Sequence, residues 1–184
     1  MRKATVEDCP LILSFIRELA EYEKLLHEVV ASVETLEETL FGEVAYAQSV
    51  IGEYQGTAVG YALFFHNFST FTGRPGIYLE DLYVQPHMRG KGFGKCLLAY
   101  LARLAVDKGC TRVEWSVLDW NEPSIQFYRS IGAAPMDEWT VQRLDGEALA
   151  SFAREFWAHV LFPAGLMAVG PLTHRTRLSD RIDY

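Results

Sequence analysis

The sequence predicts a single α/β domain, in which a mixed, mostly antiparallel sheet is flanked by helices. The chain has 184 residues and is 49% apolar, which suits one globular domain with a sizeable core. Two strand-like runs are joined by Gln55-Gly56, a dipeptide typical of a hairpin turn. A third run is followed by a helical pattern and then by a fourth run, and such a crossover makes the two strands parallel.

The N-terminal part predicts one short strand and two helices. Residues 2–4 form the expected first strand. Thr5, with acids directly behind it, is typical of a helix start, and the helix that follows keeps its apolar residues on one face to about Lys24. Ser32 opens a second, shorter helix that ends near Gly42.

The middle of the chain predicts three strands. Residues 44–54 and 57–68 form the hairpin. Residues 67–76 contain two glycines and a proline, so we expect a polar loop there. Residues 77–84 form the central strand, which Gln85-Pro86 ends.

A long helix follows, from about Gly92 to Lys108, with a leucine-rich face and Gly109 as its cap. Residues 111–118 form the next strand, expected to be parallel to the central one. Another helix begins after Asn121, and Pro123 lies in its first turn, where a missing N–H costs little.

The C-terminal part predicts weaker elements. Residues 135–141 suggest a bulged or broken strand that continues through Leu144, and residues 146–157 form a last helix. We place the domain at residues 1–158 and a C-terminal extension at residues 159–184. That extension is either disordered or packed on a neighbouring subunit.

Composition and charge narrow the function classes. The net charge of −7 argues against a general nucleic-acid binder and is compatible with a cationic substrate. The three cysteines form no Cys-x-x-Cys pair and the five histidines lack ligand spacing, so we expect free thiols in a reducing compartment and no metal site. No signal peptide and no apolar run near ~20 residues occurs, so we expect a cytoplasmic protein without a membrane span.

A basic, glycine-rich loop lies between the central strand and the long helix. Its sequence is Arg89-Gly90-Lys91-Gly92-Phe93-Gly94, and no Asp or Glu occurs between Asp81 and Asp107. Glycines let successive backbone N–H groups point to one spot, and the helix start adds its own free N–H groups and dipole. The dinucleotide GxGxxG motif and the GxxxxGK[ST] phosphate loop are both absent. The loop therefore predicts an anion site suited to a polyphosphate.

The pattern Arg-x-x-Gly-x-Gly at the opening of this helix resembles the GNAT N-acetyltransferase superfamily. A second stretch, Trp120-Asn121-Glu122-Pro123-Ser124-Ile125-Gln126-Phe127-Tyr128, and the sequence Tyr78-Leu79-Glu80-Asp81 are similar to its spermidine/spermine branch, which includes diamine and thialysine acetyltransferases. The resemblance covers roughly residues 1–156 in order. It implies a GNAT-like sheet whose two parallel strands splay apart at the acetyl-CoA site.

The resemblance also implies that acetyl-CoA is the co-substrate and that no metal takes part. The pantetheine arm of acetyl-CoA occupies the gap between the splayed strands in that family and bonds to them as an added strand would. The cofactor-binding residues that it implies are Leu82, Tyr83, Val84, Arg89, Gly90, Lys91, Gly92, Phe93, Gly94, Lys95, Asn121, Ser124 and Tyr128.

Acetylation of an amine needs a base and an acid. A primary amine has a pKa of about 10.4, so it arrives as an ammonium that cannot attack a thioester. By the resemblance, Glu80 is the base, acting through a water, and Tyr128 is the acid that protonates the leaving thiolate. A phenol with a pKa of about 10 is a neutral donor near neutrality, which suits a thiol with a pKa of about 8.5. Attack is direct, so Cys96 and Cys110 are not proposed as nucleophiles.

Acidic and aromatic side chains are expected to hold the acceptor. The resemblance implies that Tyr22, Glu23 and Glu80 bind the substrate, and we expect Asp81 and Trp115 to bind it too. Glu80 and Asp81 are adjacent in a strand, so we expect them to face opposite sides of the sheet. Asp137 or Glu138 is a further candidate acid, without a choice between them. The ordinary alternative for each of these acids is a solvated or ion-paired carboxylate.

The predicted function is therefore acetyl transfer from acetyl-CoA to the primary amine of a polyamine, a diamine or a basic amino acid such as thialysine. Two alternatives stay open. One is a GNAT enzyme that acts on a protein N-terminus, an antibiotic or an ordinary amino acid, although no cation for a carboxylate is evident near Glu80. The other is a CoA-binding sensor without catalysis. The expected partners are a small cationic amine and a second copy of the chain in a homodimer, with no nucleic acid and no membrane.

Overall fold

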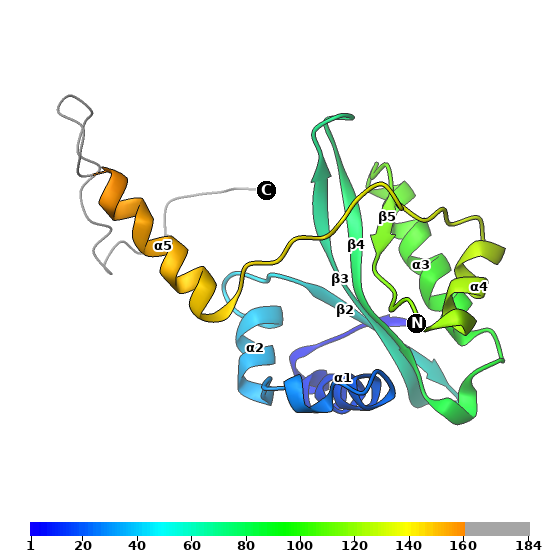
Figure 1. The fold of residues 1–184 in the computed structure, drawn as a ribbon. Helices are drawn as coiled ribbons and strands as arrows, with labels where there is room; N and C mark the ends of the chain where they lie inside the picture. Colours follow the sequence, from blue (N-terminus) through cyan, green and yellow to red (C-terminus); the bar gives the residue numbers. More distant parts are fainter. Residues whose placement is uncertain (161–184) are drawn as a thin grey trace. The chain divides into compact units, whose positions relative to one another are not determined.

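A computed structural model describes residues 1–160 of the chain (Figure 1). Its contacts divide the chain into two compact units, Met1–Ser130 and the residues from Ile131 onward, which are described separately. The predicted boundary between residues 158 and 159 stays a prediction. The predicted extension, apart from its first two residues, lies outside the described residues.

The first unit is built on a five-stranded sheet with the strand order β1-β2-β3-β4-β5. The strands are β1 (Arg2–Lys3), β2 (Gln48–Tyr54), β3 (Thr57–Ser69), β4 (Arg74–Val84) and β5 (Val113–Trp115). Neighbouring strands are antiparallel except β4 and β5, which are parallel. The prediction of a mixed, mostly antiparallel sheet is confirmed.

Helices cover both faces of this sheet (Figure 1). The helices of the first unit are α1 (Cys9–Tyr22), α2 (Val33–Phe41), α3 (Phe93–Asp107) and α4 (Glu122–Ser130). One apolar cluster joins α1 and α2 to the sheet around Phe15 and Tyr61, whose rings stack 5.6 Å apart. A second cluster joins α3 to the other face through Leu97, Leu98 and Leu101. Both clusters are formed by the apolar helix faces that the sequence predicts.

The strand β4 contains a β-bulge at Glu80. Leu79 pairs with Phe64 and Asp81 pairs with Leu63, so Glu80 is an extra residue on β4. The regular alternation of side chains between the two faces of the sheet is therefore interrupted at Glu80. Ile77 and Leu79 belong to the α3 cluster before the bulge, and Leu82 and Val84 contact the same cluster after it. The expectation that Glu80 and Asp81 face opposite sides of the sheet was wrong, because it assumed a regular strand without a bulge.

The parallel strands β4 and β5 pair only over a short length. Residues 77–79 of β4 pair with residues 113–115 of β5. Beyond that point β4 continues to Val84, while the chain after Trp115 leaves the sheet toward α4. The predicted splay between the parallel strands is therefore present in the described chain.

Two predicted elements differ from the structure. The predicted polar loop at residues 67–76 is wrong, because β3 and β4 stay paired to Ser69 and Arg74 and leave only a four-residue turn between them. The predicted strand from 135 to 144 is also wrong, since these residues form turns and irregular chain in the second unit. The strand predicted at residues 111–118 exists but is confined to Val113–Trp115.

The described part of the second unit ends in one long helix. This helix, α5, runs from Gly146 to Val160 and confirms the last predicted helix. Within residues 1–160, no helix combines the length and the apolar character that crossing a membrane requires.

Candidate active site

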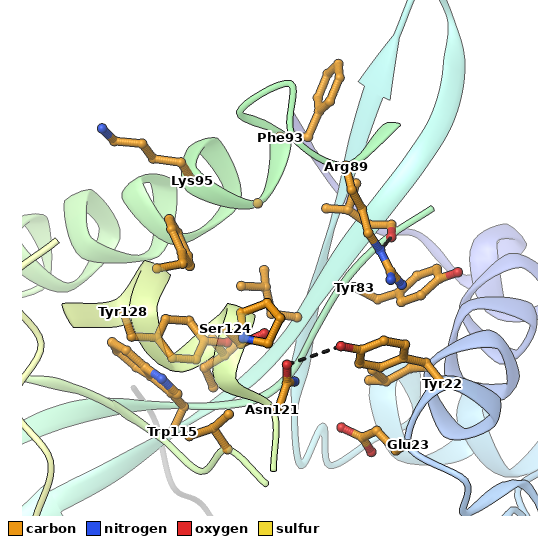
Figure 2. Close-up of a pocket in the computed structure, with 18 of the residues that line it drawn as sticks. Tyr22, Glu23, Tyr83, Arg89, Phe93, Lys95, Trp115, Asn121, Ser124 and Tyr128 are labelled. Carbon is orange, nitrogen blue, oxygen red and sulfur yellow. Dashed lines mark hydrogen bonds between the residues drawn. The ribbon is translucent and has the colours of Figure 1, made fainter. Parts of the chain in front are cut away.

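A pocket of about 750 Å³ opens where β4 and β5 diverge. It lies entirely in the first unit, and its walls come from the end of α1, the second half of β4, the loop before α3, the chain after β5 and the start of α4. Its lining residues are Leu19, Tyr22, Glu23, Leu79, Glu80, Leu82, Tyr83, Val84, Met88, Arg89, Gly90, Gly92, Phe93, Gly94, Lys95, Trp115, Ser116, Val117, Leu118, Asn121, Pro123, Ser124, Phe127 and Tyr128. Figure 2 shows that many of these side chains converge from both walls.

The glycine-rich loop forms one end of this pocket. Gly90 and Gly92 have φ values of +73° and +87°, a left-handed conformation that side chains disfavour, and Gly92 is the N-cap of α3. No acidic residue lies in the first turn of α3, so its free N–H groups and its dipole face no fixed negative charge there. This end of the pocket therefore suits an anion.

Arg89 is held against the pocket wall. Its Nε donates a hydrogen bond of 2.9 Å to the Val84 carbonyl oxygen. Its guanidinium lies 4.7 Å from the ring centre of Tyr22 and 5.6 Å from that of Tyr83. The Tyr83 hydroxyl in turn donates to Glu18 Oε2 at 2.8 Å. These partners hold the planar guanidinium group of Arg89 in place but do not use all of its N–H donors. Arg89 is therefore placed to bind an anion such as a phosphate oxygen.

The pocket fits acetyl-CoA in three respects. One end has the glycine-rich loop with Arg89 and Lys95, which suits a pyrophosphate. The middle is bounded by residues 82–84 of β4, which have no β5 partner among the described strand pairs, so an extended amide chain can bond beside them. The far wall is apolar and aromatic around Leu79, Trp115 and Phe127. Lys91 lies outside the lining, with its Nζ 3.7 Å from Met88 Sδ.

Tyr128 lies in the wall formed by α4. Its ring centre is 5.0 Å from that of Trp115 and 5.3 Å from that of Phe127 (Figure 2). Burial raises the pKa of Tyr128, and the charges of Glu23 and Tyr22 raise it further. The phenol is therefore protonated near neutrality, as a proton donor must be.

Asn121 joins the two walls of the pocket. Its carbonyl oxygen accepts hydrogen bonds from the Ser124 and Ile125 N–H groups, so it stands where the predicted N-cap of α4 stands. Its buried side chain does not take part in this cap. Instead, Oδ1 accepts a 3.1 Å hydrogen bond from the Tyr22 hydroxyl (Figure 2). This bond spans the pocket from α1 to the start of α4.

Three carboxyl groups lie near one another on this side of the molecule. Glu23 and Glu80 line the pocket, whereas Asp81 lies outside the lining and accepts a 2.6 Å bond from the Tyr61 hydroxyl. Burial raises the pKa of Asp81, and burial together with the Asp81 charge raises the pKa of Glu23. A bound cation would relieve both effects, because it favours the ionised form of each carboxyl group.

The structure thus brings together most of the predicted site. Every predicted cofactor and substrate residue except Lys91 and Asp81 lines the pocket. Sequence reasoning missed residues 116–118, which line the wall after β5, and Leu19 on α1. Residues 116–118 were predicted as strand, so the divergence of two parallel strands was the signal that could have placed them in the site.

No metal centre accompanies this pocket in the part of the chain that the structure describes. No group of three or more His, Cys, Asp or Glu side chains there is arranged to hold an ion. Cys9 is buried, Cys110 is half-buried and Cys96 is exposed, and all three are free thiols.

Comparisons with known proteins bear on the same residues. The model of the "Acetyltransferase (GNAT) family" matches residues 16–133. The chain is 43% identical to the thialysine N-epsilon-acetyltransferase of Bos taurus over 83% of this chain and 96% of that protein. It is 31% identical to the L-ornithine N5-acetyltransferase of Arabidopsis thaliana over 81% of this chain and 85% of that protein. A solved integron cassette protein of V. cholerae superposes with a TM-score of 0.71 at 25% identity, covering 83% of this chain and 96% of that one.

Proposed function

Because this chain belongs to the acetyltransferase (GNAT) family and is an acyltransferase, we propose that it acetylates the primary amine of a small cationic molecule. The observation that carries the proposal is the convergence in one pocket of an anion-binding loop, a neutral phenol and two carboxyl groups. An acetyl-CoA-dependent transfer to an amine needs each of these groups at one place.

The loop and the unpaired part of β4 are the proposed cofactor site. When bound, acetyl-CoA supplies the activated acetyl thioester. The N–H groups of residues 90–95 and the Arg89 guanidinium bind the pyrophosphate. The backbone of Leu82, Tyr83 and Val84 and the side chains of Asn121 and Ser124 bind the pantetheine amides. A backbone N–H near Leu82 stabilises negative charge that develops on the acyl oxygen.

Glu80 is the proposed base. It lines the pocket at the bulge of β4, and we place the acceptor there, next to the proposed cofactor site. A carboxylate with an ordinary pKa near 4.3 is too weak to abstract the proton of an ammonium directly. We therefore assign Glu80 to attract the cation and to pass its proton to solvent through a water. Tyr128, held neutral by burial, donates the proton to the leaving thiolate.

The proposed acceptor is a polyamine, a diamine or a basic amino acid such as thialysine. Glu23, Glu80 and the nearby Asp81 supply negative charge at the acceptor end, and Tyr22 and Trp115 supply aromatic walls. The names of the relatives from Bos taurus and Arabidopsis thaliana specify thialysine and L-ornithine, both basic amino acids. We further propose a cytoplasmic homodimer that uses no metal.

A thiol-release assay tests this function. Acetyl-CoA is mixed with the enzyme and with spermidine, spermine, putrescine, lysine, ornithine, thialysine or short peptides at mildly alkaline pH, where more of each amine is unprotonated. Turnover with any small basic amine supports the proposal. Stabilisation by CoA in a thermal melt without turnover on any acceptor would contradict it and indicate a sensor. Turnover on peptides alone would keep the catalytic residues and refute the acceptor class.

A further inference from the structure

The helix α1 ends in a turn that normally carries glycine, but here the residue is a lysine. The Leu25 N–H bonds to the Ala20 carbonyl at 2.8 Å and the Lys24 N–H to the Glu21 carbonyl at 3.1 Å, which is the double hydrogen-bond pattern of a Schellman motif. Lys24 occupies the left-handed position of this motif with φ of +63°. A side chain there costs conformational free energy that glycine avoids.

The side chain of Lys24 contacts an aromatic ring. Its Nζ lies 5.8 Å from the ring centre of Trp120, within the range of a cation–π contact. The Trp120 ring is 5.8 Å from the ring of Tyr22, whose hydroxyl bonds to Asn121. Lys24 and Trp120 are not lining residues themselves, but each is next in sequence to one, Glu23 on one wall and Asn121 on the other. We therefore place Lys24 at the rim of the pocket. An outlying backbone conformation at a pocket rim is a reason to look for a role in binding.

The ammonium of Lys24 has no carboxylate partner among the ion pairs of residues 1–160. Lys24 is exposed, so its Nζ is accessible to a ligand. The described pocket lining contains two cationic residues, Lys95 at the start of α3 and Arg89, which the Val84 carbonyl and the Tyr22 and Tyr83 rings hold in place. Lys24 is thus a third cation beside the pocket, next to Glu23 in the sequence.

Glu23 and Lys24 are consecutive residues of opposite charge at the end of α1. Glu23 lines the pocket, and Lys24 is the next residue on the turn. The head of an amino acid has the complementary pair, an α-ammonium beside an α-carboxylate. A polyamine instead carries only cations, so it would meet the like charge of Lys24 at the same place.

We propose that Lys24, supported by the Trp120 ring, binds the α-carboxylate of an amino-acid acceptor whose side-chain amine is acetylated in the pocket. This inference rests on the proposed acetyltransferase function and narrows its acceptor class. The reacting amine reaches Glu80 in the pocket while the charged head stays at the rim between Glu23 and Lys24. Lys24 is a specificity-determining residue, and acceptors without a carboxylate do not need it.

Matched acceptors that differ only by the carboxylate test this assignment. Ornithine and putrescine form one pair, lysine and cadaverine a second, and lysine methyl ester removes the negative charge while keeping the chain. The kcat/KM of each acceptor is measured for the wild type, Lys24→Gln and Lys24→Gly. A charge-assisted contact is worth about tenfold or more, so both variants are expected to lose about that factor with ornithine and lysine. Values for the two diamines and the ester are expected to change less than about twofold.

Three further measurements keep the result interpretable. Lys24→Gly places the favoured residue at the left-handed position, so its melting temperature is expected to equal or exceed that of the wild type. Lys108→Gln removes an exposed lysine at the end of α3, outside the pocket lining, and is expected to leave both acceptor classes unchanged. Lys24→Arg keeps the charge and is expected to retain most of the preference for amino acids.

The inference is overturned if the Lys24 variants lower kcat/KM equally for amino acids and diamines, or for neither, or if the wild type prefers the diamine of each pair. A wild type that acetylates none of these amines would instead overturn the proposed function. The two failures are distinguishable, because the first occurs in an active enzyme and the second does not.

Discussion

Tyr128 shows how packing sets the chemistry of one side chain. Its ring packs against Trp115 and Phe127, and burial raises the pKa of the hydroxyl, so that the hydroxyl stays protonated near neutrality. We predict that Tyr128→Phe lowers kcat by about 10²-fold or more, as loss of a general acid does. Steady-state kinetics would measure this loss, and the affinity for acetyl-CoA is expected to stay nearly unchanged in a titration.

Tyr46→Phe is the matched control for that variant, because Tyr46 is 72% exposed and lies outside the pocket. It is expected to have wild-type kinetics. An unchanged kcat in Tyr128→Phe would reduce Tyr128 to an aromatic packing residue.

Asp81 illustrates a residue whose charge costs stability. Burial raises its pKa above the ordinary 3.8, so the folded protein holds this proton more tightly than the unfolded chain does. Ionisation of Asp81 therefore lowers the free energy of unfolding at neutral pH. This destabilisation disappears as the pH falls below about 4, because Asp81 is then protonated in both the folded and the unfolded state. We predict that Asp81→Asn melts at a higher temperature than the wild type at neutral pH and that the difference narrows in acid. Thermal melts over this pH range measure the effect.

The same substitution is expected to weaken binding of the acceptor. The effect of the Asp81 charge on the pKa of Glu23 shows that the two carboxyl groups interact, so Asp81→Asn removes one negative charge beside the acceptor end. A raised KM for the acceptor with an unchanged KM for acetyl-CoA is the expected kinetic result. Glu43→Gln, at an exposed carboxylate outside the pocket, serves as the control, and an Asp81→Asn protein that melts lower at neutral pH would contradict the prediction.

Sequence reasoning at the residue scale worked best where a local motif carried the chemistry. The glycine-rich loop and the stretch from Trp120 to Tyr128 are each continuous in sequence. All residues of the loop except Lys91 line the pocket, and so do Asn121, Pro123, Ser124, Phe127 and Tyr128. It could not predict the bond between Tyr22 and Asn121, which joins residues 99 positions apart. It also missed Lys24, because neither its left-handed backbone nor its position over Trp120 has a local sequence signal.

At the scale of secondary structure, one ion pair ties β1 to the start of α1. Arg2 donates from Nη1 and Nη2 to the two Asp8 oxygens at 2.6 and 2.8 Å, and the Thr5 N–H also bonds to Asp8. The hydrogen bonds from Arg2 lower the pKa of Asp8 from 3.8 to about 2, although burial opposes them. The folded state therefore binds fewer protons than the unfolded chain between these two values.

This pair makes a pH-dependent contribution to stability. A pKa lowered in the folded state stabilises the protein above the unfolded pKa, and the contribution is lost as the pH falls from about 4 to about 2. We predict that Asp8→Asn lowers the free energy of unfolding by about 2 kcal/mol at neutral pH and by much less near pH 2. Urea titrations at several pH values measure it.

Glu53→Gln is the control for the same arginine. Glu53 accepts from Arg2 Nε at 2.8 Å, but its side chain is 33% exposed, so its loss is expected to cost less than about 1 kcal/mol. The difference in the free energy of unfolding between the wild type and Asp8→Asn could also stay constant with pH. That result would show that the ion pair does not act through titration of Asp8.

Local patterns predicted elements well when tertiary partners agreed with them. The helices α1 to α5 and the hairpin at Gln55-Gly56 are all present. The loop predicted at residues 67–76 failed because its glycine and proline residues signal turns, yet β3 continues to pair with β4 through this stretch. The strand predicted near Val141 is absent, because its apolar residues lack a tertiary partner. Trp139 and Val141 are 69% and 81% exposed, so the pattern has no covering surface in its own unit.

At the scale of the whole molecule, the assembly state is a prediction. The helix α5 exposes Leu149, Phe152 and Phe156 by 51%, 62% and 54%, and their spacing of three and four residues places them on one face of the helix. We predict a homodimer at micromolar concentration, measured by light scattering on the full chain. Phe152→Glu is expected to shift it toward monomer, whereas Glu147→Gln on the same helix is not. A monomeric wild type would refute the prediction.

The bulge in β4 has a consequence for how this chain tolerates changes in length. Turns between elements accept inserted or deleted residues, because they do not set which side chains face which core. Between Leu79 and Leu82 no such freedom exists. Deleting Glu80 would make the strand regular and turn Leu82 and Val84 away from the α3 cluster. An alignment of functional relatives should therefore contain gaps in the turns but none between these two leucines.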